Sequence, residues 1–161
     1  MTQIYLSYAY VDNQNFQGQR GWINDFREDL ENNLSFTSGK ILPISFFHNK
    51  QFSKPNLLTI KYIQSTRLFL IIGTPAYFYS DYCQSELKLF LKIKKENVFQ
   101  QIIYVSKIPC EETKLLSQLP LDHHFSFYDL KGDIELSRIH QSKKYFSKIE
   151  KISKQILIAL K

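Results

Sequence analysis

Glycine is scarce in this chain of 161 residues: there are five, and they form no complete phosphate-binding loop motif. Neither GxGxxG nor GxxxxGK[ST] occurs, which argues against a Rossmann dehydrogenase and a nucleoside triphosphatase. No serine stands in a GxSxG elbow, the motif that presents the nucleophile of an α/β-hydrolase. The commonest nucleotide and acyl-transfer motifs are therefore missing.

Cysteine is also scarce, and long apolar runs are absent. Cys83 and Cys110 are the two cysteines, and a small buried thiol suits Cys83, which lies within an apolar helical pattern. Few cysteines favour a reduced setting, so we expect a cytoplasmic protein. The longest apolar run, 68–72, is too short to cross a bilayer, and the N-terminus leads straight into a strand-like run rather than a signal peptide. We expect no membrane partner.

The histidines and cysteines show no metal-ligand spacing, so we expect no metal and no bound cofactor. The net charge is +6, and most of the excess lies in 141–161, where six lysines and one glutamate give +5. A basic balance can indicate nucleic acid or an anionic membrane. Because these lysines fall on one side of a helical pattern, a solvated helix face explains them better, and we expect no nucleic acid partner.

Strand and helix patterns alternate along the whole chain, which we interpret as one domain covering 1–161. The predicted strands are 4–7, 41–47, 68–72, 102–105 and 124–128. The predicted helices are 22–38, one from about 55, 80–96, a short one within 110–119, and a C-terminal one around 146–160, with 74–76 as a loop. This order implies an α/β fold with an open, parallel, five-stranded sheet and helices on both faces.

Within that sheet, the continuous apolar run 68–72 predicts a central strand buried on both faces. Pro43 predicts an edge position for the strand 41–47. Ligands of such sheets bind at the carboxyl ends of the strands. The segments after Ser7, Phe47 and Gly73 should therefore border any site.

Glu86 is the unusual residue of the helix 80–96. At roughly 100° per residue it falls within the apolar arc of that helix, among residues such as Tyr82 and Phe90. A carboxylate there is costly unless it has a partner or lines a pocket. Two interpretations remain open: Glu86 tilts to the rim of the core and pairs with a lysine, or it belongs to a functional site.

Two segments resemble the Toll/interleukin-1 receptor (TIR) domain family. IYLSYAYVD, 4–12, looks like its first signature, a hydrophobic strand ending in Ser-Tyr with an Asp shortly after, and Trp22 fits the following helix. STRLFLIIGTPAYFYSDYCQSEL, 65–87, is similar to its strand, Ser-Pro-x-Tyr turn, Ser-x-aromatic-Cys and Glu-Leu run. The resemblance covers about the first 105 residues.

The resemblance implies a flavodoxin-like fold and, as in catalytic members, cleavage of NAD⁺ as substrate by the glutamate of this helix. That role falls on Glu86. The expected substrate-binding residues are Tyr8, Ala9, Asp12, Phe47 and Tyr82. The expected assembly loop, through which TIR domains contact one another, contains His48, Lys50, Phe52 and Pro55.

The sequence also departs from the family pattern. Thr74 replaces the usual serine before Pro75, and Tyr82 stands where tryptophan is common. His48-Asn49 stands where an acidic residue is common, and Asn56 where many members have glycine. The third signature of the family, near the C-terminus, is not recognisable.

Two functions from different classes follow. One is an NAD⁺ glycohydrolase or cyclase in an immune or effector system such as antiphage defence, acting through Glu86 and self-association. The other is a non-catalytic TIR adaptor that acts by self-association alone. A carboxylate among apolar groups favours the first, because it can stabilise the oxocarbenium-like transition state of nicotinamide–ribose cleavage.

Overall fold

The computed structural model describes residues 3–14, 20–47, 53–110, 114–129 and 134–161. Five parallel strands form one sheet in the order β2-β1-β3-β4-β5. The strands are β1 (Ile4–Ser7), β2 (Ile44–Ser45), β3 (Leu68–Gly73), β4 (Ile102–Ser106) and β5 (His124–Ser126). This is an α/β fold of the flavodoxin-like kind, and the fold predicted from the sequence is confirmed.

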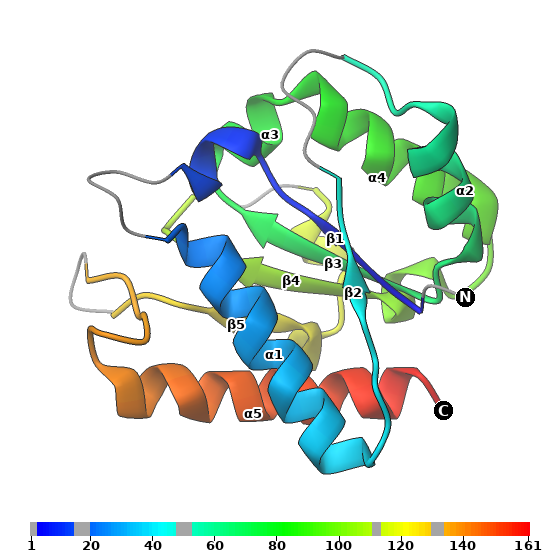
Figure 1. The fold of residues 1–161 in the computed structure, drawn as a ribbon. Coiled ribbons are helices and arrows are strands. Elements are labelled where there is room, and N and C mark those ends of the chain that lie inside the picture. The colour runs from blue at the N-terminus through cyan, green and yellow to red at the C-terminus, as the bar shows by residue number, and fades with distance from the viewer. Residues whose placement is uncertain (1–2, 15–19, 48–52, 111–113, 130–133) are drawn as a thin grey trace.

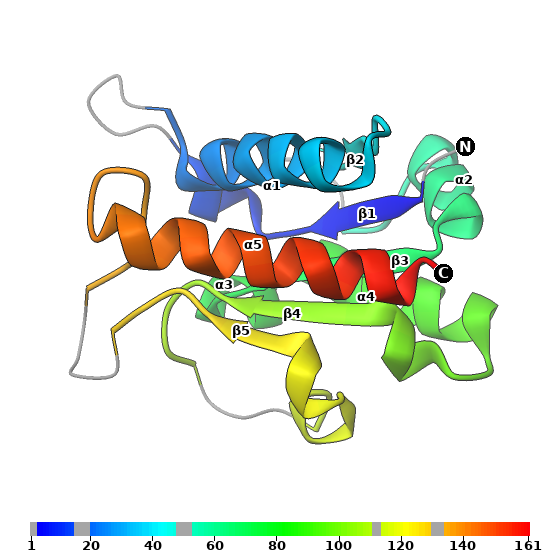
Figure 2. The same ribbon diagram turned by 90° about the horizontal axis from the view of Figure 1, so that it is seen from below.

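Helices cover both faces of the sheet (Figures 1 and 2). One face carries α1 (Trp22–Ser38) and α5 (Ser142–Ala159), which lie side by side. The other carries α2 (Leu57–Ser65), α3 (Pro75–Tyr79) and α4 (Asp81–Lys94). The described connections include the 3₁₀ turns η1 (Tyr10–Asn13), η2 (Val98–Gln101), η3 (Leu116–Gln118) and η4 (Leu121–His123).

The central strand β3 shows how the two cores are built. Its side chains alternate, so that Leu68, Leu70 and Ile72 face α1 and α5 whereas Phe69 and Ile71 face α2 to α4. Every residue of β3 is buried, and the strand pairs with β1 and β4. The predicted central strand at 68–72 is therefore confirmed.

The strand predicted at 41–47 is wrong in length, because only Ile44 and Ser45 pair with β1. Pro43 has no N–H to donate, and the N–H of Ile44 donates to the Glu31 carboxylate on α1 (N···O 2.8 Å) rather than to a neighbouring strand. The predicted edge position is correct, because β2 is the first strand of the sheet.

Two further predictions need correction. The residues 74–76, predicted as a loop, begin the helix α3, because the Thr74 side chain caps it and Pro75 fits its first turn. The helix predicted within 110–119 is only the 3₁₀ turn η3 in the described part of that segment. The helix predicted at 80–96 is confirmed as α4, with Ser80 as its N-cap; it ends before Lys95, which has a positive φ.

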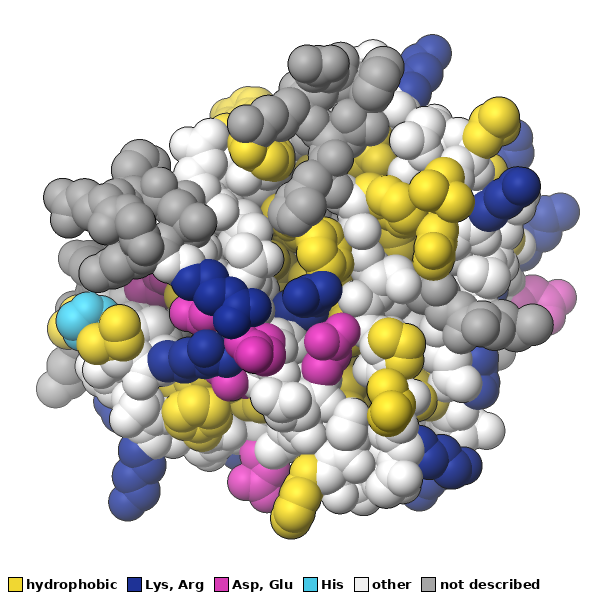
Figure 3. All heavy atoms as spheres, in the orientation of Figure 1, with side chains coloured by type: hydrophobic (Ala, Val, Ile, Leu, Met, Phe, Trp, Pro, Cys, Tyr) yellow, Lys and Arg dark blue, Asp and Glu magenta, His cyan; other side chains and the backbone are white. Residues whose placement is uncertain are grey.

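An ionic cluster joins the segment before α5 to α1. Arg138 forms a bidentate pair with Asp29 (2.6 and 2.8 Å) and also contacts Asp25 (3.2 Å) and Glu28 (3.0 Å). The indole N–H of Trp22 donates to the backbone oxygen of Leu136 (2.8 Å). Figure 3 shows acidic and basic side chains gathered over α1 on this face. The last third of the chain is thus fastened to the first helix.

Gly73, at the carboxyl end of β3, has no room for a side chain, because an added Cβ would overlap the ring of the fully buried Tyr104 on β4. We predict that Gly73→Ala lowers the free energy of unfolding by about 1–3 kcal/mol, measured by chemical denaturation. If overlap is the cause, the same change costs less in a Tyr104→Ala background. An equal cost in both backgrounds would contradict this explanation.

Candidate functional site

Glu86 lies on the face of α4 that packs on β1, and two hydroxyls of β1 hold its carboxyl group. The Tyr5 hydroxyl donates to Oε1, and the Ser7 hydroxyl donates to Oε2 (2.6 Å). Residues i and i+2 of a strand point to the same face, which is why Tyr5 and Ser7 both reach this group. Each carboxyl oxygen therefore has its own donor.

Burial has the largest effect on the pKa of Glu86, because this residue is only 2% exposed. Removal from water raises its pKa from 4.5 to about 7, and hydrogen bonds from Ser7, Tyr5 and Tyr82 oppose that rise. Glu86 forms no ion pair with any lysine of the described residues. The interpretation of Glu86 as a rim residue paired with lysine is therefore wrong for this structure.

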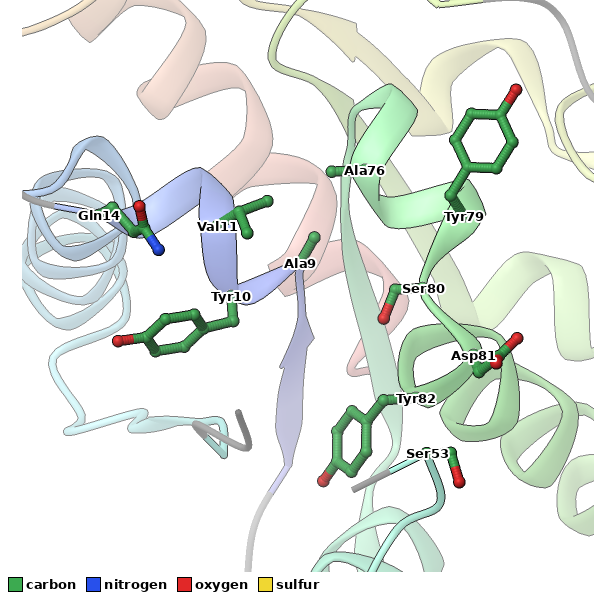
Figure 4. Close-up of a pocket in the computed structure, with 10 residues that line it drawn as sticks. All are labelled: Ala9, Tyr10, Val11, Gln14, Ser53, Ala76, Tyr79, Ser80, Asp81 and Tyr82. Atoms are coloured by element: carbon green, nitrogen blue, oxygen red, sulfur yellow. The ribbon is translucent and has the colours of Figure 1, made fainter. Parts of the chain in front are cut away.

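A pocket of about 650 Å³ opens at the carboxyl end of the sheet, and Tyr82, which hydrogen-bonds to Glu86, is one of its lining residues (Figure 4). One wall comes from the segment after β1 and the other from α3 and the start of α4, while the ring of Tyr79 points away. The described residues that line it are Ala9, Tyr10, Val11, Gln14, Ser53, Ala76, Tyr79, Ser80, Asp81 and Tyr82. Ligands of open α/β sheets bind at this edge.

Tyr82 connects the pocket with Glu86, which lies one turn later on α4. Its ring lines the pocket, its hydroxyl lies 3.1 Å from Thr59 Oγ1 on α2, and it also hydrogen-bonds to Glu86. Glu86 itself is not among the described residues that line the pocket. In this arrangement the Glu86 carboxyl group is buried, and Tyr82 is one of the side chains that contact it.

The other expected substrate-binding residues fall in different surroundings. Ala9 lines the pocket, whereas Tyr8, Asp12 and Phe47 are not among its described lining residues. The Asp12 carboxylate accepts from Thr74 (2.5 Å), and burial raises its pKa. The ring of Phe47 stacks on Tyr5, with centroids 6.5 Å apart. The structure thus brings Ala9 and Tyr82 to the pocket. Phe47 instead packs on Tyr5, the residue whose hydroxyl donates to Glu86.

Most of the expected assembly loop, namely His48, Lys50 and Phe52, lies outside the described residues. Pro55 is described and precedes Asn56, whose side chain caps α2 by accepting from the Thr59 N–H (2.9 Å). This cap gives asparagine a local role at the position where the resembling family often has glycine. Hydrophobic side chains gather over α2 (Figure 3), and Leu57 and Leu58 are exposed there.

Sequence reasoning missed Tyr5 and Ser7 as parts of the site. A signal was available, because a tyrosine in the middle of a fully buried strand needs a hydrogen-bond partner for its hydroxyl. The pattern of β1 places Tyr5 and Ser7 on one face but does not say which helix residue meets them. That information comes only from the packing of α4.

No group of three or more metal-ligating side chains occurs among the described residues. In the same part of the chain, no helix combines the length and the apolar character that a membrane span requires.

No family model matches this chain, and no curated protein sequence matches it significantly. The fold and the site define an α/β domain with a buried carboxyl group, Glu86, that Tyr82 links to a pocket.

Proposed function

We propose that this chain is a TIR domain that cleaves the nicotinamide–ribose bond of NAD⁺, as a glycohydrolase or cyclase in an immune or effector system. The observation that carries the proposal is the Glu86 carboxyl group: it is buried, held by the hydroxyls of Tyr5 and Ser7, and hydrogen-bonded to Tyr82, which lines a pocket at the carboxyl edge of the sheet. A buried acid without a basic partner is unfavourable for folding, and such groups cluster at functional sites.

The chemistry suits this group. Cleavage of the bond develops positive charge on the ribose, and a fixed carboxylate in a water-poor site stabilises that charge. Nicotinamide leaves as a neutral molecule, so no general acid is required. The ring of Tyr82, on the pocket side of Glu86, offers a face for the flat nicotinamide.

Glu86 must become accessible before it can act, because the structure holds it covered. Tyr82 is the residue that we propose to move, since it lines the pocket and also bonds to Glu86. Its other partner is Thr59, on the helix that follows the expected assembly loop. Movement of α2 would therefore release Tyr82.

The test is release of nicotinamide from NAD⁺ by the purified protein, followed by chromatography. We expect nicotinamide together with linear or cyclic ADP-ribose. Nicotinamide release no faster than in buffer, from folded protein at high concentration, would contradict the enzymatic proposal and favour the adaptor.

Self-association is part of the proposal for both functions. The exposed Leu57 and Leu58 at the start of α2 support it, because adjacent exposed leucines are a common feature of contact surfaces. For the enzyme, we expect nicotinamide release per molecule to rise with protein concentration, and Phe52→Asp in the expected assembly loop to lower it. Activity per molecule that stays constant on dilution, with this variant unaffected, would mean that the monomer is the catalyst.

We also propose that the domain is cytoplasmic. Its described cysteines, Cys83 and Cys110, are both free thiols, as in a reducing compartment. Burial raises the pKa of the Cys83 thiol to about 12, so this cysteine stays protonated and unreactive.

A further inference from the structure

Tyr5 contributes more to the Glu86 group than its place in the core requires. Its ring packs between Phe47 and Phe69, a position that phenylalanine would fill equally well. Its hydroxyl, however, is directed at Oε1 of Glu86.

The surroundings of Glu86 make that hydroxyl important. The titratable groups that act on Glu86 or are acted on by it come from three sides: Tyr5 and Tyr8 from β1 and its continuation, Tyr77 from α3, and Tyr82 and Cys83 from α4. Burial raises the pKa of Tyr5, Tyr8, Tyr77 and Cys83, so all four are neutral at physiological pH. Among the described residues, no lysine or arginine is one of the groups that influence Glu86. The described donors that stabilise its charge, Ser7, Tyr5 and Tyr82, are all neutral.

We propose that Tyr5 is a positioning residue, whose hydroxyl fixes the Glu86 carboxyl group in one orientation and favours its ionised form; the catalytic consequence rests on the proposed function. The Tyr5 and Ser7 donors come from one strand and hold one oxygen each. Loss of either removes one of the few donors of a buried carboxylate, and hydrogen bonds to charged groups are stronger than those between neutral groups.

The direct test is an NMR titration of protein carrying ¹³C at glutamate Cδ, with the Glu86 resonance assigned by its loss in Glu86→Gln. We expect a midpoint of about 7 in the wild type. In Tyr5→Phe we expect it to rise by about one pH unit or more, since a hydrogen bond to a charged group has that strength. Tyr104→Phe is the matched control, because it removes a buried tyrosine hydroxyl that bonds to Cys110 instead.

A second measurement uses the wild-type protein, so that it does not depend on whether Tyr5→Phe folds. The ¹³Cζ resonance of Tyr5 should titrate with the same midpoint as Glu86, because the hydroxyl senses the charge that it is bonded to. An unchanged Glu86 midpoint in Tyr5→Phe, an equal shift in Tyr104→Phe, or a Tyr5 resonance that ignores the Glu86 titration overturns the proposal.

The enzymatic consequence is a change in the pH profile of NAD⁺ cleavage. We expect the acidic limb of kcat/KM to move to higher pH in Tyr5→Phe by the same interval as the NMR midpoint, and to stay in place in Tyr104→Phe. If the acidic limb of kcat/KM does not move with the NMR midpoint of Glu86, the proposed effect of Tyr5 on catalysis is wrong. Absence of cleavage in every variant, with the NMR shift present, refutes the proposed function but leaves the coupling of Tyr5 and Glu86 established.

Discussion

If the proposed function holds, Glu86→Gln should lower nicotinamide release from NAD⁺ by at least about a hundredfold, since removal of one electrostatic stabiliser commonly has that effect. Glutamine keeps the shape of the side chain and can bond to both Tyr5 and Ser7, but it carries no charge to stabilise the ribose cation. The measurement is the initial rate of release under saturating NAD⁺, with circular dichroism to show that the fold is kept.

The matched control is Glu96→Gln, which changes an exposed glutamate beyond the end of α4 and should keep the wild-type rate. The wild-type rate should also rise with pH around 7, because burial raises the pKa of Glu86 to about 7 and the proposed reaction uses its ionised form. A Glu86→Gln protein as active as the wild type would mean that another residue carries the reaction.

The same substitution should stabilise the fold at alkaline pH. Burial raises the pKa of Glu86 from 4.5 in the unfolded chain to about 7 in the folded one, so the folded state binds the proton more tightly. Stability is therefore lost as pH rises from about 4.5 to about 7, and the full loss, about 3 kcal/mol, applies above that window. Glutamine never ionises, so Glu86→Gln avoids this loss.

Chemical denaturation at several pH values checks this expectation. At pH 8 we expect Glu86→Gln to unfold at a higher denaturant concentration than the wild type, and at pH 4.5 the two midpoints should nearly coincide. Glu96→Gln should track the wild type throughout. A Glu86→Gln protein less stable than the wild type at pH 8 would show that the ionised carboxyl group stabilises the fold. A gain in stability at the expense of activity is typical of functional sites.

Strong local patterns made the sheet and its main helices predictable from the sequence. The all-apolar run at 68–72 and the helical pattern at 80–96 correctly predicted β3 and α4. The prediction was wrong where tertiary contacts override local preference. The 41–47 run reads as a strand, but its backbone donor at Ile44 bonds to Glu31, a residue of α1 that no local pattern connects with it.

The candidate site was predictable in its centre and not in its surroundings. The apolar neighbours of Glu86 revealed a misplaced charge, and the structure confirms its burial. Tyr5 and Ser7 were missed because their role depends on how α4 packs against β1. Phe47, predicted to border the substrate cleft, stacks on Tyr5 and is not among the described lining residues of the pocket.

The Arg138 cluster has a consequence for how this domain is synthesised. Its bonds span up to 113 residues of sequence, from α1 to the segment before α5, and α5 covers the same core as α1. While the chain emerges from the ribosome, Asp25 and Glu28 can already pair with Arg20, whereas Arg138 follows only after most of the remaining sequence. The core facing α1 therefore closes late in translation, and an interrupted nascent chain leaves an apolar, acidic helix open to chaperones.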